Sequence, residues 1–239
     1  AQSLNRYEYS AYQMGTTFRL VFYAPADTLA DIASKAAFER IAALNQIFSD
    51  YDPNSEVSQL SELAGSGQAI EVSDELWEVL NYAQKVSRKS KGAFDVSIGA
   101  LSKLWRKAFR QQVFPKQADI EQAKTSVNYK AIKLYTKSQK VALTLKGMRL
   151  DFGGIAKGYA VDEAMKVLAS RGIQSALVDG GGDILVTNAP PNKAGWQITT
   201  EKDTAQLLTN TAIATSGDRY RFLEHEGIRY SHIVHPKTG

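Results

Sequence analysis

The pattern of apolar and polar residues predicts helices mostly in the first half of this chain and strands mostly in the second. Residues 16–23 are rich in β-branched and aromatic side chains, which indicates a first strand. Apolar residues recur at helical spacing over residues 29–48, and the turn formers at residues 49–55 predict a loop behind this helix. Ser73 is a candidate N-cap for a helix that ends near Ser90. Further helices are expected at residues 57–63, 101–109 and 119–123.

Strand patterns dominate the chain from residue 127 onward, and their polar turns favour antiparallel pairing. One helix is expected among them, at residues 158–170, with Gly172 as its C-terminal glycine. The expected strands are residues 132–135, 141–145, 175–178, 184–186, 196–199, 206–208, 211–215, 219–223 and 230–234. The fold class predicted from this order is α+β.

The chain shows no internal repeat, no low-complexity segment and no linker that would mark a domain boundary. We therefore expect a single domain over residues 1–239, with a helical part at about 26–126 and a mainly β part at about 127–239. Hydrophobic residues make up 44% of the chain, which is enough for a sizeable core, and no apolar run approaches the roughly 18 residues of a membrane span.

Charge and cysteine content exclude several classes of function. The net charge is +4, and basic residues such as Arg106 and Lys107 are interleaved with acids elsewhere, which argues against nucleic-acid binding. The chain has no cysteine, so disulfides, thiolate catalysis and cysteine metal sites are excluded.

The segment from Asp151 to Asp162 carries the strongest chemical signal in the sequence. It places three glycines, Lys157 and two carboxylates around an expected helix start, as a site for a metal-bound phosphate group would require. An ordinary turn followed by a solvated helix face fits the same pattern, and the pattern alone leaves both interpretations open. A Walker loop is excluded because Gly158 follows the lysine. Kinase signatures are missing, and the second glycine run, residues 179–183, leads into a strand rather than a helix.

Several motifs occur in the same order as in a known family. They are Met14-Gly-Thr16, residues 48–51 and 55–60, Gly92-Ala-Phe-Asp95, the segment 151–162, Gly180-Gly-Gly-Asp183, residues 212–217 and residues 231–239. Together they resemble the ApbE-like flavin transferases, the FAD:protein FMN transferase family. The resemblance covers nearly the whole chain and implies an ApbE-like α+β fold with an FAD cleft between a helical and a β half.

The resemblance also implies an activity, a cofactor set and a partner. FAD would be cleaved at its pyrophosphate, FMN would pass to a threonine hydroxyl of an acceptor flavoprotein subunit of redox-pump or electron-transfer type, and AMP would leave. The implied FAD-site residues are Met14, Tyr51, Ala93, Phe94, Asp95, Asp151, Lys157, Thr215 and Ile233. Gly154 would bind Mg²⁺ through its backbone carbonyl. His232 and Lys157 are the implied catalytic residues, because a histidine can accept the threonine proton and a lysine can neutralise phosphate charge.

Three departures from the family pattern bear on this hypothesis. His235 stands where the family has Asp or Asn, and Ser61 where many members have Asn. The sequence also stops at Gly239, before the Asp and Thr that complete the family's Mg²⁺ site, so we expect the native chain to be longer. A FAD-binding or flavin-storage protein and an FAD pyrophosphatase are the alternative functions. The resemblance further implies a periplasmic location or one on the outer face of the cytoplasmic membrane, with any lipid anchor outside this sequence.

Overall fold

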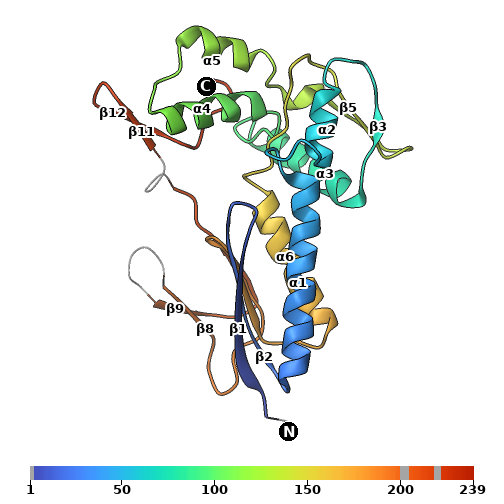
Figure 1. Cartoon of the computed structure of the whole chain (residues 1–239), viewed down its shortest axis with the longest axis vertical. Coiled ribbons are helices and arrows are strands. Elements are labelled where there is room, and N and C mark those ends of the chain that lie inside the picture. The colour runs from blue at the N-terminus through green and yellow to red at the C-terminus, as the bar shows by residue number, and fades with distance from the viewer. Residues whose placement is uncertain (1–2, 200–204, 218–221) are drawn as a thin grey trace. The chain divides into compact units, whose positions relative to one another are not determined.

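The computed structural model describes residues 3–199, 205–217 and 222–239 (Figure 1). The chain forms two compact units, and each of them combines two separate segments. Residues 1–45 and 156–216 make the sheet unit, and residues 46–155 and 217–239 make the helical unit.

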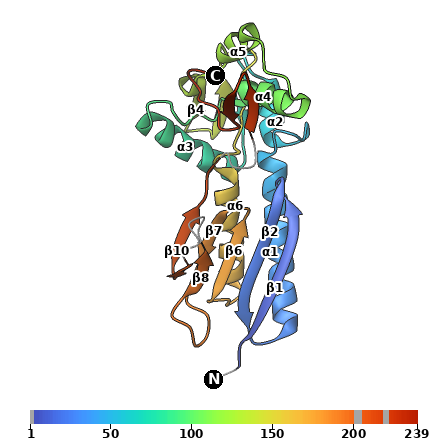
Figure 2. The ribbon, with the colours of Figure 1, turned by 90° about the vertical axis from the view of Figure 1, so that its left-hand side faces the viewer.

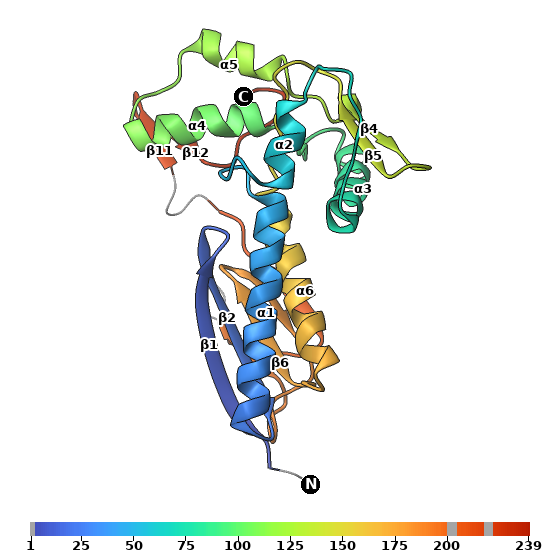
Figure 3. The ribbon, with the colours of Figure 1, turned by 45° about the vertical axis from the view of Figure 1, so that its right-hand side comes forward.

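A five-stranded antiparallel sheet, in the order β1-β2-β6-β7-β10, organises the sheet unit (Figure 2). Its strands are β1 (Asn5–Gln13), β2 (Thr16–Ala24), β6 (Ala176–Gly180), β7 (Asp183–Val186) and β10 (Thr211–Ala214). The helix α6 (Ala156–Ser170) and the part of α1 (Asp27–Phe48) up to Asn45 cover one face (Figure 3). Small side chains let α1 approach the sheet closely, since Ala30, Ala33 and Ala37 are fully buried.

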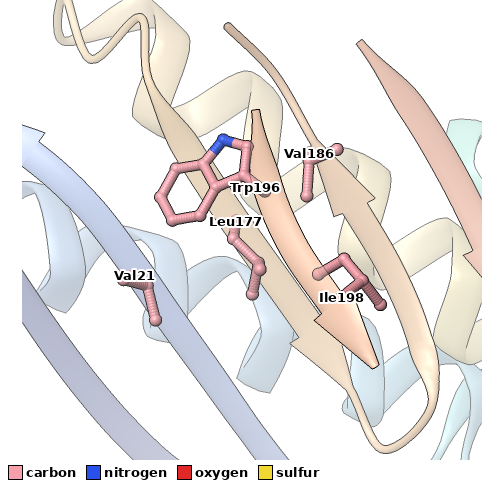
Figure 4. Packing of buried hydrophobic residues seen from close by; sticks show 5 residues of the cluster. All are labelled: Val21, Leu177, Val186, Trp196 and Ile198. Carbon is pink, nitrogen blue, oxygen red and sulfur yellow. The ribbon is translucent and has the colours of Figure 1, made fainter. Parts of the chain in front are cut away.

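The opposite face of this sheet is covered by the hairpin of β8 (Trp196–Thr199) and β9 (Ala205–Leu208). Val21, Leu177 and Val186 occupy successive paired positions on the sheet. Trp196 and Ile198 of β8 pack on them, and all five side chains are buried (Figure 4). Strand alternation therefore sends one set of side chains to the helices and the other to this hairpin.

Helices and two small sheets make up the helical unit (Figure 1). Its helices are α2 (Glu56–Glu62), α3 (Asp74–Lys89), α4 (Gly99–Gln111), α5 (Gln117–Lys124) and the 3₁₀ turn η1 (Tyr129–Ala131). The strands β3 (Ile70–Glu71), β5 (Lys140–Leu143) and β4 (Ile132–Tyr135) pair in that spatial order, and β11 (Phe222–His225) pairs with β12 (Ile228–Ser231). The hairpin β11–β12 packs on α4 and α5 through a core that includes Trp105, Ile120 and Leu223.

The expected elements are found close to the expected bounds. Ser73 caps α3 by accepting a hydrogen bond from the N–H of Leu76, and Gly172 ends α6 with a positive φ of 81°. The expected strand 219–223 begins at Phe222, and residues 218–221 lie outside the described residues. The strand β1 was not expected. Within the described ranges, no helix has the length and apolar character needed to cross a membrane.

Candidate functional site

The residues implied by the motifs are divided between the two units. The sheet unit holds Met14, Lys157 and Thr215. The helical unit holds Tyr51, Ala93, Phe94, Asp95, Asp151, Gly154, His232 and Ile233. The boundary at residues 155/156 falls within the glycine-rich segment, so this segment contributes to both units.

In the sheet unit, Lys157 lies beside the turn that joins β6 to β7. Its Nζ atom is 3.7 Å from Oδ2 of Asp183, and both side chains are partly exposed. The N–H of Thr215 donates to the carbonyl of Gly182 at 3.0 Å, which holds the Thr215 segment against the same turn. The structure thus brings Lys157 and Thr215 to one end of the sheet. The acid that pairs with the lysine is Asp183, which lies outside the 151–162 segment.

Met14 occupies the tight turn between β1 and β2. Gln13 pairs with Thr16 across the turn, and both Met14 and Gly15 have positive φ, at 50° and 76°. Such a two-residue turn normally favours Asn-Gly, because a methionine in the left-handed region is strained. Gly181 packs directly against Thr16, so this turn lies at the same end of the sheet as the β6–β7 turn.

In the helical unit, the Gly92–Asp95 segment is held by the C-terminal end of α3. The N–H of Gly92 donates to the carbonyl of Ser87 at 2.8 Å, and the N–H of Phe94 donates to Ser90 Oγ at 3.0 Å. Ala93 is exposed and Phe94 is partly exposed. These bonds fix the backbone on both sides of Ala93 and present the two side chains at the surface of the unit.

Asp95 is buried, and its carboxylate is engaged by the protein itself. Oδ1 accepts hydrogen bonds from the N–H and the hydroxyl of Ser97, at 2.8 and 2.6 Å, and Oδ2 accepts one from the N–H of Tyr129 at 2.9 Å. The side chain is 7% exposed. This geometry makes Asp95 a positioning residue for the Ala93–Phe94 segment, while the implied contact with FAD stays a prediction.

The segment before the glycines runs alongside the residues that follow Asp95. Asp151 donates its N–H to the carbonyl of Val96 at 2.8 Å, and its Oδ1 accepts from the N–H of Gly153 at 2.7 Å. A Cβ atom placed on Gly154 would lie 3.4 Å from the Phe94 ring, at van der Waals contact, so Gly154 lies directly beside that ring. Phe94, Asp151 and Gly154, far apart in the sequence, therefore meet in one place.

Arg106, which the sequence did not single out as a site residue, organises the surroundings of Tyr51. Its guanidinium makes two hydrogen bonds to Asp50, one of them at 3.1 Å, and lies 3.6 Å from Oδ2 of Asp151. It also covers the Tyr51 ring at 4.5 Å from the centroid, and that ring is 77% exposed. Burial alone would lower the pKa of Arg106, but the hydrogen bonds to Asp50 and Tyr51 and the nearby carboxylates raise it above its ordinary value. The guanidinium is thus a permanent cation that backs an aromatic ring.

Ser61 connects α2 to the backbone just before Asp151. Its buried hydroxyl donates to the carbonyl of Val57 at 2.8 Å and accepts from the N–H of Leu150 at 3.1 Å. Leu150 directly precedes Asp151. Ser61, which stands where many family members have Asn, therefore supports the backbone of the glycine-rich segment.

The last residues of the chain form a second feature of the helical unit. His232 and Ile233 are exposed just after β12, and Ile233 lines a pocket of about 420 Å³ together with Trp105, Tyr230 and His235. Nδ1 of His235 accepts from the N–H of Lys237 at 3.2 Å. Asp and Asn side chains accept the same kind of hydrogen bond from the N–H two residues later in the chain. His235 therefore retains the turn that the Asp or Asn of the family pattern would form.

The implied Mg²⁺ site is not completed by these side chains. Over residues 3–199, 205–217 and 222–239, no three His, Cys, Asp or Glu side chains gather closely enough to hold a metal ion. Gly154 is exposed, but Asp151, the nearest acid in the motif, is engaged with Gly153 and faces Arg106. We therefore derive no chemical step through a metal.

The arrangement has clear chemical capacities within each unit. The helical unit offers an exposed Tyr51 ring with a cation behind it and the Phe94 ring, both suited to flat, partly apolar groups. The sheet unit offers the cation of Lys157 and the hydroxyl of Thr215, both suited to phosphate oxygens. Each set matches one part of a dinucleotide, either its flat rings or its pyrophosphate.

Two named relatives are similar to this sequence. The FAD:protein FMN transferase of Treponema pallidum is 31% identical over 229 residues, which cover 85% of this chain and 63% of that protein. The FAD:protein FMN transferase of Klebsiella pneumoniae is 28% identical over 241 residues, which cover 98% of this chain and 73% of that protein. The chain thus spans about two thirds to three quarters of the length of these relatives.

Solved structures confirm the α+β fold. The flavin transferase ApbE from Vibrio cholerae superimposes with a TM-score of 0.85 at 25% identity, covering 99% of this chain and 78% of that one. The ApbE protein from Thermotoga maritima gives 0.84 at 28% identity, covering 98% and 77%. The model of the ApbE family matches residues 14–239. Because this match covers nearly the whole sequence, the chain belongs to the ApbE family.

Proposed function

We propose that this protein transfers FMN from FAD to a threonine hydroxyl of an acceptor flavoprotein and releases AMP. The observation that carries the proposal is the family match over residues 14–239, a span that contains every implied site residue. Relatives that bear the name FAD:protein FMN transferase support the same conclusion.

We assign the flat rings of FAD to the helical unit. Tyr51 supports this assignment, since one face of its ring lies on Arg106 while the side chain is 77% exposed. Phe94 and Ala93 lie at the surface of a loop whose backbone is fixed by α3 and by Asp95. Rings held in place before binding lose little conformational entropy when a ligand stacks on them.

We assign the neutralisation of phosphate charge to Lys157, with Thr215 as a hydroxyl donor. The lysine pairs with Asp183 at 3.7 Å, a long distance that leaves its ammonium group able to turn to a phosphate oxygen. Displacement at phosphorus depends mainly on positioning and on such charge neutralisation.

His232 is the proposed general base. The threonine oxygen would attack the phosphorus on the FMN side of the pyrophosphate, and a new P–O bond would form as the bridging P–O bond breaks. AMP would leave with the bridging oxygen, and the hydroxyl proton would pass to the imidazole. A histidine titrates near neutral pH and can both accept and release this proton.

Mg²⁺ dependence is a further part of the proposal. The Gly154 carbonyl would supply one ligand, and pyrophosphate oxygens and water would supply others, as is usual for this ion. We also propose a periplasmic location or one on the outer face of the cytoplasmic membrane. The acceptor would then be a subunit of a redox pump or an electron-transfer protein on that side.

The test is incubation of the protein with FAD, Mg²⁺ and an acceptor carrying a target threonine, followed by in-gel flavin fluorescence. We expect covalent flavin on the acceptor and one AMP released per FMN transferred. FMN appearing without acceptor would identify a pyrophosphatase instead, and FAD retained intact would identify a storage protein. Omission of Mg²⁺ measures the metal dependence separately.

Two histidine variants locate the base. His232→Ala should lower the transfer rate by about 100-fold or more and leave FAD affinity unchanged, because general bases contribute on this scale. His225→Ala is the matched control, since His225 is also exposed in the helical unit but stacks on Phe114. Equal rates for His232→Ala and the unmodified protein would remove His232 from the mechanism.

A further inference from the structure

Two segments of the helical unit carry a concentration of positive charge that the proposed reaction does not use. Residues 79–94 hold four Lys or Arg residues and no acid, and residues 127–150 hold six and no acid. The first segment is the C-terminal half of α3 and the loop behind it, and the second includes η1, β4 and β5. The fold brings them side by side, since α3 lies next to β4 and β5 (Figure 3).

A pocket of about 420 Å³ lies where the two segments meet. Arg88 of α3, Lys130 of η1 and Lys133 of β4 supply its charge, and none of its lining residues is acidic. The remaining lining residues are Gln84, Tyr129, Ile132 and Leu134. The lining therefore combines three cations with the apolar residues Ile132 and Leu134.

Hydrogen bonds within and between elements of the fold hold the lining of this pocket in place. Gln84 is buried and donates to the carbonyl of Tyr129 at 2.7 Å, which ties α3 to η1. Nζ of Lys133 donates to the carbonyl of Lys130 at 2.9 Å, which holds one ammonium group in the lining. An anion with an adjoining apolar body would satisfy both parts of such a pocket.

The surroundings of the pocket resemble a surface that meets lipid headgroups more than one that meets a protein. Eight of the ten cations in the two segments are lysines, and lysine is depleted from the cores of protein interfaces. An exposed tyrosine flanks the cations, since Tyr135 follows Lys133 by two residues on β4. This spacing places Tyr135 on the same face of the strand as Lys133, and tyrosine rings favour the headgroup level of a bilayer.

We propose that this surface, Arg88, Lys130 and Lys133 with Tyr135, docks the protein on membranes rich in anionic phospholipid. A lipid phosphate would lie at the three cations, and its glycerol would lie over Leu134. The other lysines of the two segments would add long-range attraction to the charged bilayer.

Binding of the full chain to vesicles tests the proposal. The protein is sedimented with vesicles of phosphatidylcholine, with or without phosphatidylglycerol, at low and high salt. We expect binding only when phosphatidylglycerol is present and weaker binding at high salt. The triple substitution Arg88→Gln, Lys130→Gln, Lys133→Gln should lower the partition coefficient by about 100-fold, since each cation near such a surface contributes several-fold.

A matched control separates this surface from net charge. Lys103, Lys107 and Lys116 are exposed cations on or near α4 and α5, and their joint replacement by Gln removes the same charge. Vesicle binding of this control should fall by no more than about threefold, because its charges lie outside the docking surface. Arg88→Gln alone should weaken vesicle binding by about fivefold. This single variant tests the same surface if the triple variant does not fold.

Three results would overturn the proposal. One is that the protein does not bind anionic vesicles. Another is that the triple substitution in the pocket and the control substitution lower the partition coefficient equally. The third is tight binding to polyglutamate or to an oligonucleotide without vesicle binding, which would make the partner a soluble polyanion.

Discussion

Replacement of Asp95 distinguishes a positioning residue from a residue that contacts FAD. Asp95 is 7% exposed, and its carboxylate accepts one hydrogen bond from the N–H of Tyr129 and two from Ser97. Asp95→Ala removes both carboxylate oxygens, and with them all three hydrogen bonds, without adding bulk. The Ala93–Phe94 segment would then lose its connection to η1.

The cost follows from the groups left without a partner. A buried donor that loses its acceptor costs about 1–3 kcal/mol, and bonds to a charged group lie at the upper end of the range. The N–H groups of Ser97 and Tyr129 are both orphaned, so we expect Asp95→Ala to lower the free energy of unfolding by about 3–5 kcal/mol. Asp95→Asn should cost about 1–2 kcal/mol, because its carbonyl still accepts from Ser97 while its amide faces the N–H of Tyr129.

Urea unfolding followed by circular dichroism measures these values, and FAD titration of the folded variants measures affinity. Ser97→Ala is the matched control. The Ser97 hydroxyl is buried, donates to Asp95 and accepts from the N–H of Asn128 at 2.8 Å. A positioning role predicts that Ser97→Ala and Asp95→Ala both weaken FAD binding. If Asp95→Ala kept its stability within about 0.5 kcal/mol and still lost FAD, the reasoning would be refuted in favour of direct contact.

Three further changes test the sheet unit. Met14→Asn should raise the free energy of unfolding by about 0.5–1 kcal/mol in a urea titration, since Asn tolerates positive φ, and should weaken FAD binding; an unchanged affinity would remove Met14 from the site. Gly181→Ala should cost about 2–4 kcal/mol by the same assay, because its Cβ would collide with Thr16 at a φ of 75°, and a neutral result would contradict the close packing. Burial and the hydrogen bond to Asp31 raise the pKa of Tyr9 from 10.0 to about 12, so its neutral hydroxyl stabilises the fold below pH 10 and this contribution is lost as the pH rises towards 12. Tyr9→Phe should show a smaller loss of stability over that pH range, by up to about 1 kcal/mol after allowance for partial exposure, and identical pH profiles would argue against the shift.

The sequence predicted most elements because their signals are local. Caps and turn formers such as Ser73 and Gly172 act on their own neighbours, so the helix bounds could be derived without the fold. The strand β1 was missed because residues 5–13 contain many polar residues and form an edge strand. Its stability comes from partners outside the segment: the Tyr9 ring stacks on Phe22, and its hydroxyl donates to Asp31 on α1.

The motifs supplied the candidate site residues, and their contacts with FAD stay a prediction. Arg106 was missed because nothing in the spacing of a helix indicates which loop its polar side chains reach. Its partners, Asp50 and Tyr51, lie more than fifty residues earlier, and only the packing of α4 brings them together. The same reason explains why Asp183 could not be foreseen as the partner of Lys157. A helix position alone could not favour Asp183 of β7 over the acids within the motif.

Different physical reasons explain why glycine occupies its positions in the 151–162 segment, and this difference bears on the proposed function. A Cβ atom on Gly153 would lie 3.0 Å from Oδ1 of Asp151, closer than ordinary van der Waals contact, so close packing favours a glycine there. Gly158 is different, because a Cβ placed on it would meet no atom of the described residues within 4 Å. A glycine inside a helix costs about 1 kcal/mol relative to alanine, so packing within the sheet unit gives no reason for it. An open helix surface without a side chain, one residue after Lys157, is what a ligand would need to approach the backbone closely. Packing within the fold does not require a glycine at position 158. Gly158 is therefore the glycine of this segment that points most directly to a bound phosphate group.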